Sequence, residues 1–433
     1  MGARKEIVPC RSPDLGKDRV GFLKRKNISE VLGILEQKSR ISRAELARAT
    51  KLSPATISNV VTELHRFGLV RELGHGESLG GRRPILIEFD PEAFYLAGVD
   101  LGITKVIAIV ADLHGRIVAK AKLDIEVHSG RERILSRMFE ATRMVLAGPR
   151  EPIRKKVAGL GLSVPGLVDP ERGLSLFAPN IPDWQGVPLV ELFQREFGIP
   201  TYLENDARAM ALGEARYGAG KNCENLLCVN IGHGIGCGII INGELYRGTG
   251  FTAGEIGHIT IIPSGPLCHC GNRGCLEVMA GGHAISASAI RVAKTGVKTL
   301  IRDLVGGEIN MITAEVVFEA AKRGDSAAQE LLKEAGRYIG IGLASAVNLL
   351  GPDMIVIGGG VARAGAFIID EVSATIKERA FTTMALAPVI VPSALGEDAS
   401  CIGACAFVMG RTIMQGEPVS PTAAGSRPIP RDT

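Results

Sequence analysis

The spacing of apolar positions predicts three helices near the N-terminus. Within residues 18–37 the apolar side chains recur with helical periodicity, at Ile28, Val31, Leu32 and Leu35. Ser42 and Glu45 have the spacing of a capping box, which predicts the start of a short second helix. Ser53 and Pro54 supply an N-cap and a proline at the first helical position, so a third helix begins there.

Two alternating segments follow the third helix, and a glycine-rich loop joins them. Residues 69–73 and 85–89 predict the two strands of a hairpin. The loop between these strands contains Arg82 and Arg83. Three short helices followed by a hairpin describe a winged helix-turn-helix, which we predict over residues 18–90.

After the hairpin the pattern changes to strands that alternate with helices. The predicted elements are strands at 96–101, 105–111 and 116–125, a helix at 131–146, a strand at 157–164, and a hairpin at 226–231 and 235–241. The two glycine-bearing hairpins lie about 130 residues apart along the chain. This repetition predicts a duplicated α/β architecture with two lobes.

Composition describes a soluble globular protein with two or three domains. The chain has 433 residues, of which 46% are hydrophobic and 22% are charged. It has no uninterrupted run of about 20 apolar residues, and the basic segment 1–17, expected to be flexible, lacks the apolar core of a secretory signal. We therefore expect a cytoplasmic protein with no membrane partner. The tail 416–433 is rich in Pro, Ser and Gly, which predicts disorder.

The charge is distributed unevenly along the chain. Residues 1–90 contain 17 Lys and Arg against 11 Asp and Glu, so this segment carries +6 and the remainder −2. A basic segment joined to a mildly acidic body suits contact with nucleic acid. The alternative for this segment is a three-helix interaction domain with a solvated basic face.

The third predicted helix has the side chains expected of a DNA-reading element. Its apolar side packs inward, which leaves a set of small residues facing outward: Ala55, Thr56, Ser58 and Asn59. Short side chains near a helix N-terminus can approach base edges in the major groove. Arg82 and Arg83 are placed to enter a minor groove or to bind phosphate.

Three of the nine cysteines lie within eight residues, at Cys268, Cys270 and Cys275. Their thiolates suit Zn²⁺, and the intervening glycines permit a tight turn. A structural zinc site needs a fourth ligand, for which His258, His269 and His233 are the candidates. His269 is disfavoured because both of its neighbours would already be ligands. The alternative is a group of three free thiols.

Polar residues recur at glycine-bearing turns and beside helices. The polar residues and glycines of the two hairpin turns are Asp100, Gly102, Thr104, Gly234 and Gly236. The polar residues beside predicted helices or the cysteine segment are Asn205, Asp206, Glu255 and Glu277. A carboxylate beside a glycine turn can hold Mg²⁺ and phosphate, although many such turns serve packing alone.

In this order, the motifs resemble the ROK family of repressors, open reading frames and kinases. The resemblance covers nearly the whole chain, and the N-terminal motifs resemble those of bacterial xylose-, glucose- and N-acetylglucosamine-responsive repressors. It implies an actin-like, ribonuclease-H-like pair of lobes over residues 91–415, with sugar bound in a cleft near residue 205.

The resemblance also implies roles for individual residues. The side chains that would bind sugar hydroxyls are those of Asn205, Asp206, Glu255, His258 and Glu277, and Gly166 and Asn180 would line the same cleft. His258 would also be the fourth zinc ligand, which would couple the zinc segment 258–277 to the sugar.

Two functions remain compatible with this resemblance. In a sugar kinase Asp206 would be the catalytic base, and Asp100 with the glycine turns would hold Mg-ATP. However, Ile103 and His233 stand where the family's kinases usually have glycine and threonine, which disfavours phosphate binding.

We therefore predict a sugar-responsive regulator, with efficient phosphorylation not expected. It would act as a repressor that binds operator DNA, with a sugar or sugar phosphate as effector, and would assemble as a homodimer or homotetramer. A sugar-binding scaffold without a DNA role is a further alternative, which the small outward side chains of the third helix disfavour.

Overall fold

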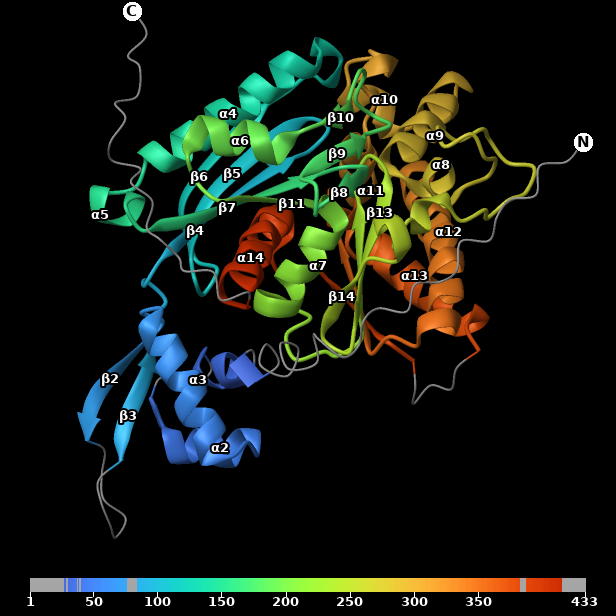
Figure 1. The fold of residues 1–433 in the computed structure, drawn as a ribbon. Helices are drawn as coiled ribbons and strands as arrows, with labels where there is room; N and C mark the ends of the chain where they lie inside the picture. The colour runs from blue at the N-terminus through green and yellow to red at the C-terminus, as the bar shows by residue number, and fades with distance from the viewer. Residues whose placement is uncertain are drawn as a thin grey trace, which may run out of the picture. The chain divides into compact units, whose positions relative to one another are not determined.

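The computed structural model describes residues 27, 28, 30–36, 38, 40–75, 84–381 and 387–414. Its contacts divide the chain between Ala93 and Phe94 into two units, and the described residues from Gly410 onward group with the first (Figure 1). Residues 1–17, the loop residues Arg82 and Arg83, and the tail 416–433 lie outside the described residues.

The first unit contains the three predicted helices. Residues 30–36 are helical, and Ile28, Val31, Leu32 and Leu35 are buried as the periodicity predicts. Helix α2 (Arg43–Thr50) begins with the predicted capping box, in which the Ser42 amide donates to Glu45 Oε2 at 2.9 Å. Helix α3 (Pro54–Arg66) begins at Ser53, whose hydroxyl accepts from the Thr56 amide at 3.1 Å.

A small antiparallel sheet completes the first unit. Strands β2 (Val70–His75) and β3 (Ile85–Phe89) form the predicted hairpin. A further strand, β1 (Ile41–Ser42), pairs with β3 and gives the order β1-β3-β2. The fold is thus a winged helix-turn-helix.

The second unit is built around two five-stranded sheets that have the same topology. The first, in the order β11-β7-β4-β5-β6, contains β4 (Tyr95–Leu101), β5 (Lys105–Asp112), β6 (Ile117–Asp124), β7 (Val157–Val164) and β11 (Thr201–Asn205). The second, in the order β14-β13-β12-β15-β16, contains β12 (Leu226–Ile231), β13 (Ile235–Ile241), β14 (Glu244–Tyr246), β15 (Met354–Gly358) and β16 (Val389–Pro392). Each has an antiparallel meander followed by two parallel strands. The predicted duplication is therefore confirmed.

Each sheet carries its own helices. The first lobe adds η1 (Val127–Ser129), α4 (Arg131–Ala147), α5 (Glu151–Arg154), α6 (Leu189–Phe197) and a small sheet of β8 (Leu167–Asp169), β9 (Leu174–Phe177) and β10 (Gln185–Val187). The second lobe adds η2 (Thr249–Phe251), η3 (Ile256–His258), α8 (Leu276–Ala280), α9 (Gly282–Lys294), α10 (Leu300–Leu304), η4 (Ile309–Met311), α11 (Ala314–Lys322), α12 (Ser326–Leu350), η5 (Val361–Ala364), α13 (Ala366–Arg379) and η7 (Gly396–Asp398). Among the described helices, none is both long enough and apolar enough to cross a membrane.

Two helices lie between the sheets, α7 (Asp206–Tyr217) and α14 (Ala399–Met414), as Figure 1 shows. They cross at glycines: a Cβ on Gly403 would lie 1.6 Å from the Ala209 carbonyl oxygen, and one on Gly213 would lie 2.7 Å from the Ala399 carbonyl oxygen. Because glycine has no side chain, the two helix backbones can come into direct contact here. This crossing fixes the first residue of α7, Asp206, between the two lobes.

Candidate functional site

The junction of β11 and α7 places the predicted Asn205-Asp206 pair. Asn205 caps the helix, since its Oδ1 accepts from the amides of Ala207 at 3.0 Å and Arg208 at 3.2 Å. Its Nδ2 donates to the Gly166 carbonyl at 3.1 Å and to Asp206 Oδ1 at 2.9 Å. Because the amide uses both donors and both lone pairs here, Asn205 positions Asp206 and the turn at Gly166.

Asp206 accepts hydrogen bonds from residues of both lobes. Its Oδ2 accepts from Asn230 Nδ2 on β12 at 3.1 Å. Burial, together with the charge of Asp100, raises the pKa of Asp206 to about 7. Asp100 is the penultimate residue of β4 and accepts from the Ser163 hydroxyl at 2.7 Å, while burial raises the pKa of Asp100 to about 6. Sequence reasoning missed Asn230 and Ser163, although each is a polar residue within a strand of apolar neighbours.

A second group of carboxylates lies where the β12–β13 hairpin meets α8. Glu277 Oε2 accepts from the Ile235 amide at 3.1 Å, and a Cβ on Gly234 would lie 2.2 Å from that oxygen. Glu255 precedes η3 and is half-buried; burial raises its pKa, while the charges of His258 and Arg208 lower it. The charge of Glu277 acts on Glu255, and that of Glu255 acts on Asp206. The structure thus brings the predicted carboxylates into one electrostatic neighbourhood.

The predicted phosphate turns have packing roles. Gly102 closes its turn by donating from its amide to the Lys105 carbonyl at 2.9 Å, and Thr104 is exposed. A Cβ on Gly236 would lie 3.0 Å from the Ala207 Cβ, so this glycine lets β13 approach α7. Ile103 packs against the core of the first lobe.

The remaining predicted cleft residues lie near the Gly166 turn. Gly166 has φ +81°, and a Cβ there would lie 2.2 Å from the Phe177 carbonyl oxygen. The turn therefore packs on the end of β9, and half-buried Asn180 follows in the next turn.

The cysteine segment folds into a four-residue cluster. The ligand atoms of His258, Cys268, Cys270 and Cys275 all lie within 4.8 Å of one another. His258 Nδ1 is 3.6 Å from Cys268 Sγ, and the Sγ atoms of Cys270 and Cys275 are 3.7 Å apart. Four such donors with these spacings fit a tetrahedral zinc ion. Of the three candidate histidines, His258 belongs to this group.

The other two candidate histidines, His233 and His269, lie near a third histidine, His283. The rings of His233 and His269 lie 5.6 Å and 6.1 Å from the ring of His283. Burial, followed by the charge of His283, lowers the pKa of His233, so its ring favours the neutral form.

A buried ion-pair network lies behind the carboxylates. Glu204 on β11 is fully buried and pairs with Arg208 at 3.1 Å and with Arg247 at 2.8 Å. Arg208 Nη1 also donates to the Phe251 carbonyl at 2.8 Å. Arg208 thereby ties α7 to the loop that leads to Glu255. Sequence reasoning missed this pair, because Glu204 lies on a strand and Arg208 on the helix that follows, so no helical spacing relates them.

The first unit presents the predicted DNA-reading residues on α3. Ala55 and Asn59 are exposed, whereas Thr56 and Ser58 are half-buried. The opposite side of the helix packs inward through its apolar residues, namely Ile57, Val60, Val61 and Leu64.

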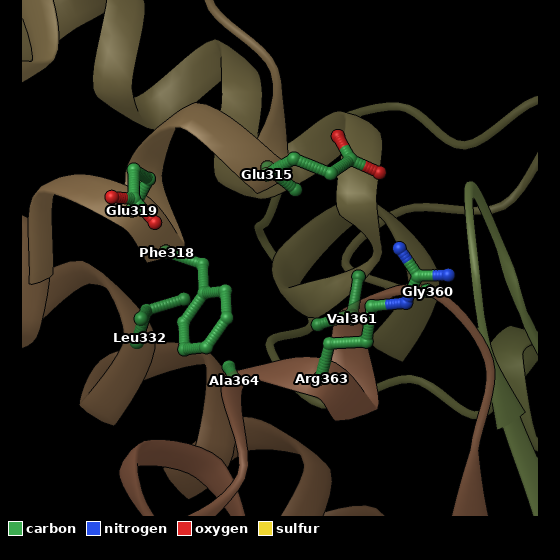
Figure 2. A pocket seen from close by; sticks show the side chains of 9 residues that line it. Glu315, Phe318, Glu319, Leu332, Gly360, Val361, Arg363 and Ala364 are labelled. Carbon is green, nitrogen blue, oxygen red and sulfur yellow. The ribbon is translucent and has the colours of Figure 1, made fainter. Parts of the chain in front are cut away.

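A cavity lies near the glycine run that follows β15 (Figure 2). Phe318 and Leu332 give it apolar walls, and Gly360 and Arg363 lie at another side. The charged groups of Glu315 and Glu319 also line it.

Comparisons with known proteins agree with this architecture. The profile described as ROK family matches residues 96–411, and the one described as winged helix-turn-helix DNA-binding matches residues 24–71. A xylose repressor of Caldicellulosiruptor bescii is 33% identical over 90% of this chain and 96% of its own length.

Solved structures include a ROK family transcriptional regulator described as a homolog of the E. coli MLC protein, which is 27% identical with a TM-score of 0.77. The match covers 91% of this chain and 97% of the other. A ROK family glucokinase from Streptomyces griseus, in complex with glucose and AMPPNP, is 34% identical with a TM-score of 0.66 and covers 72% of this chain and 98% of its own. The family profile matches well over half of the residues, and the chain belongs to the ROK family.

Proposed function

We propose that this protein is a sugar-responsive transcriptional repressor. The observation that carries the proposal is the joining of a winged helix-turn-helix to a ROK domain in one chain. It is supported by the xylose repressor of Caldicellulosiruptor bescii, which is 33% identical over 90% of this sequence. The α3 residues Ala55, Thr56, Ser58 and Asn59, with Arg82 and Arg83, would contact operator DNA. As a DNA-binding regulator the protein would act in the cytoplasm, and a dimer or tetramer would read repeated half-sites.

The effector would lie in the ROK domain beside Asp206. Asp206, Glu255, Glu277 and the free ring nitrogen of His258 supply acceptors and donors for sugar hydroxyls. Asn205 supports Asp206 from behind, because its own hydrogen-bonding groups are used within the chain. Gly166 and Asn180 would form the neighbouring wall, and the residues 91–415 would make up the effector domain.

Zinc would have a structural role at His258, Cys268, Cys270 and Cys275. Four protein ligands leave no open coordination position, as in structural sites. His258 would bind the ion through Nδ1 and present Nε2 to the sugar side, so that the metal orients a sugar-binding ring.

A residual sugar kinase is the second candidate, because Asp206 has a pKa of about 7, which suits a general base. Mg-ATP would then lie near Asp100, Gly102, Thr104, Gly234 and Gly236. Against efficient phosphorylation, Ile103 packs against the core and offers no polar group to a phosphate. Coupled ADP release with xylose, glucose and N-acetylglucosamine measures this activity, and turnover abolished by Asp206→Asn would establish the kinase.

Operator binding tests the main proposal. Fluorescence anisotropy of the full chain with a selected DNA site, at fixed salt, should show sequence preference that one sugar of the panel changes. A thermal-shift screen identifies that sugar, since a ligand at 100 times its Kd stabilises by about 2.7 kcal/mol. Equal binding to all DNA sequences, with or without sugar, would refute the repressor.

A further inference from the structure

Three exposed histidines from three separate segments lie close together on the second lobe. His233 is in the turn between β12 and β13, His269 is in the cysteine segment, and His283 is the second residue of α9. The ring of His283 contacts both of the others, with its centre 5.6 Å from that of His233 and 6.1 Å from that of His269. The chain contains only eight histidines, so three in one place are not a product of composition.

The backbone brings His233 and His283 together. The Gly282 amide donates to the Gly232 carbonyl at 2.9 Å, and a Cβ on Gly282 would lie 2.7 Å from the same oxygen. A Cβ on Gly281 would lie 2.9 Å from the His233 carbonyl oxygen. Because these two glycines let the start of α9 lie against the turn, the two imidazoles project from adjoining stretches of backbone.

The cysteine segment supplies the third ring. His269 stands between Cys268 and Cys270, whose sulfur atoms belong to the four-residue cluster with His258. The Cys268 amide donates to the Asn272 carbonyl at 2.7 Å, which closes this part of the segment into a tight turn. Since the neighbouring sulfurs belong to the cluster, the imidazole of His269 lies outside it and contacts His283 instead.

The nitrogen atoms of these rings can act as ligands. Within the part of the chain that the structure describes, none of the three imidazoles forms a hydrogen bond or an ion pair with another residue. Loss of surrounding water, followed by the charge of His283, lowers the pKa of His233. The neutral imidazole is the form that binds a metal ion, so this shift favours coordination.

The spacing of the rings suits a single ion. A metal–nitrogen bond of about 2.0–2.1 Å places the centres of two coordinating imidazoles about 5 Å apart. The observed separations of 5.6 Å and 6.1 Å are slightly larger, and the ring planes are tilted by 49° and 48°. Exposed side chains change rotamer readily, so rotation about their side-chain bonds brings the three rings onto one ion.

We propose that His233, His269 and His283 form a metal site separate from the four-residue cluster, which binds a divalent transition-metal ion of the kind that imidazole prefers, namely Zn²⁺, Ni²⁺ or Cu²⁺. Three protein ligands leave coordination positions to water, so this ion exchanges more readily than one held by four protein ligands. The site goes beyond the proposed repressor function, and its test involves neither DNA nor sugar.

A bound ion has a structural consequence for the second lobe. It joins the β12–β13 turn to the start of α9 and to the cysteine segment, three segments that are separate along the chain. The same turn binds Glu277 through the Ile235 amide at 3.1 Å. Occupancy of the histidine site therefore stabilises the backbone that holds this carboxylate.

Isothermal titration calorimetry of the full chain with Ni²⁺, at neutral pH and without a histidine affinity tag, tests the site. The zinc content of each sample is measured in parallel. The wild type should bind one Ni²⁺ per chain in addition to any metal in the four-residue cluster. Because each ring supplies one ligand, His233→Ala, His269→Ala and His283→Ala should each weaken Ni²⁺ binding by about tenfold or more.

An exposed histidine elsewhere provides the matched control. His128→Ala removes an exposed imidazole of the first lobe and should leave Ni²⁺ affinity unchanged. His233→Ala and His283→Ala should retain the zinc content of the wild type, since neither residue belongs to the four-residue cluster. The proposal would be overturned by a wild type that binds no Ni²⁺, or by unchanged affinity in any of the three variants. Zinc lost together with Ni²⁺ in His283→Ala would also overturn it, because the ion would then belong to the four-residue cluster.

Discussion

Asp206 is a buried acid whose charge is opposed by its surroundings. Burial and Asp100 raise its pKa from the ordinary value of 3.8 to about 7, so the folded state takes up protons more readily than the unfolded state between these values. This contribution therefore makes stability fall as the pH rises from about 4 to about 7. Asp206→Asn removes this titration, and the Tm of the variant relative to the wild type should increase between pH 5 and pH 8. A difference in Tm independent of pH would contradict the raised pKa.

The buried pair of Glu204 and Arg208 gives a second prediction for a single residue. Both side chains are at most 1% exposed, so neutralising Glu204 leaves the buried Arg208 without its paired carboxylate. Glu204→Gln should lower the free energy of unfolding by about 3–5 kcal/mol. Urea denaturation measures this loss, and Glu151→Gln, at an exposed ion pair, serves as the control with an unchanged midpoint.

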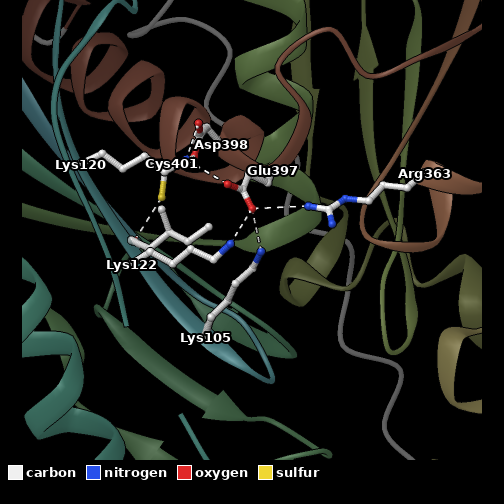
Figure 3. Close-up of polar contacts among 8 residues, drawn as sticks. Lys105, Lys120, Lys122, Arg363, Glu397, Asp398 and Cys401 are labelled. Carbon is white, nitrogen blue, oxygen red and sulfur yellow. Dashed lines mark hydrogen bonds and ion pairs between the residues drawn. The ribbon is translucent and has the colours of Figure 1, made fainter. Parts of the chain in front are cut away.

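Single residues differ in how far their role could be predicted from the sequence. The sequence indicates Asp100, Asp206 and Glu277 as candidate site residues, because each stands beside a glycine turn or a helix start, and the structure brings such residues together. The ion pair of Lys105 and Glu397 (Figure 3) could not be found in this way. The two residues are 292 positions apart, and their contact exists only because two lobes meet.

The crossing of α7 and α14 gives a prediction for a pair of elements. A methyl group on Gly403 would lie 1.6 Å from the Ala209 carbonyl oxygen, so Gly403→Ala forces the helices apart. We expect a loss of about 1–3 kcal/mol or more in the free energy of unfolding, despite the higher helix propensity of alanine.

The same helix provides the control for this substitution. Among the described residues outside its own helix backbone, no atom would lie within 4 Å of a Cβ on Gly410, so Gly410→Ala should be neutral or stabilising. Chemical denaturation of both variants compares them directly. Equal stability of Gly403→Ala and Gly410→Ala would contradict the close crossing.

The bounds of strands with a continuous apolar pattern can be predicted closely from the sequence. The strands β7, β12 and β13 have the predicted bounds, because buried strands read as apolar runs that end at glycine or polar residues. The short strands β1, β8 and β10 were missed. They have two or three residues each, too few for a period, and depend on pairing with a distant partner.

At the scale of the whole molecule, metal removal should affect the sugar site. If zinc binds His258 and the three cysteines, metal analysis should find about one zinc per chain. Removing it with a chelator should lower the Tm and weaken sugar binding, because the orientation of His258 depends on the ion. Cys270→Ser should reproduce both effects. Full zinc content in Cys270→Ser, or undiminished sugar affinity after zinc removal, would contradict the coupling.

The two units should be separable by mutation, because the proposed DNA contacts and the proposed sugar contacts lie in different parts of the chain. Asn59 is exposed on α3, so Asn59→Ala should weaken operator binding by about tenfold or more while leaving the sugar-induced rise in Tm unchanged. Asp206→Asn should retain operator affinity but lose the response to sugar. Both variants are measured by anisotropy for operator binding and by thermal shift for sugar binding. Asn59→Ala should change only the operator affinity, and Asp206→Asn should change only the response to sugar. A loss of sugar binding in Asn59→Ala, or of operator binding in Asp206→Asn without sugar, would show that the units do not act as a separate reader and sensor.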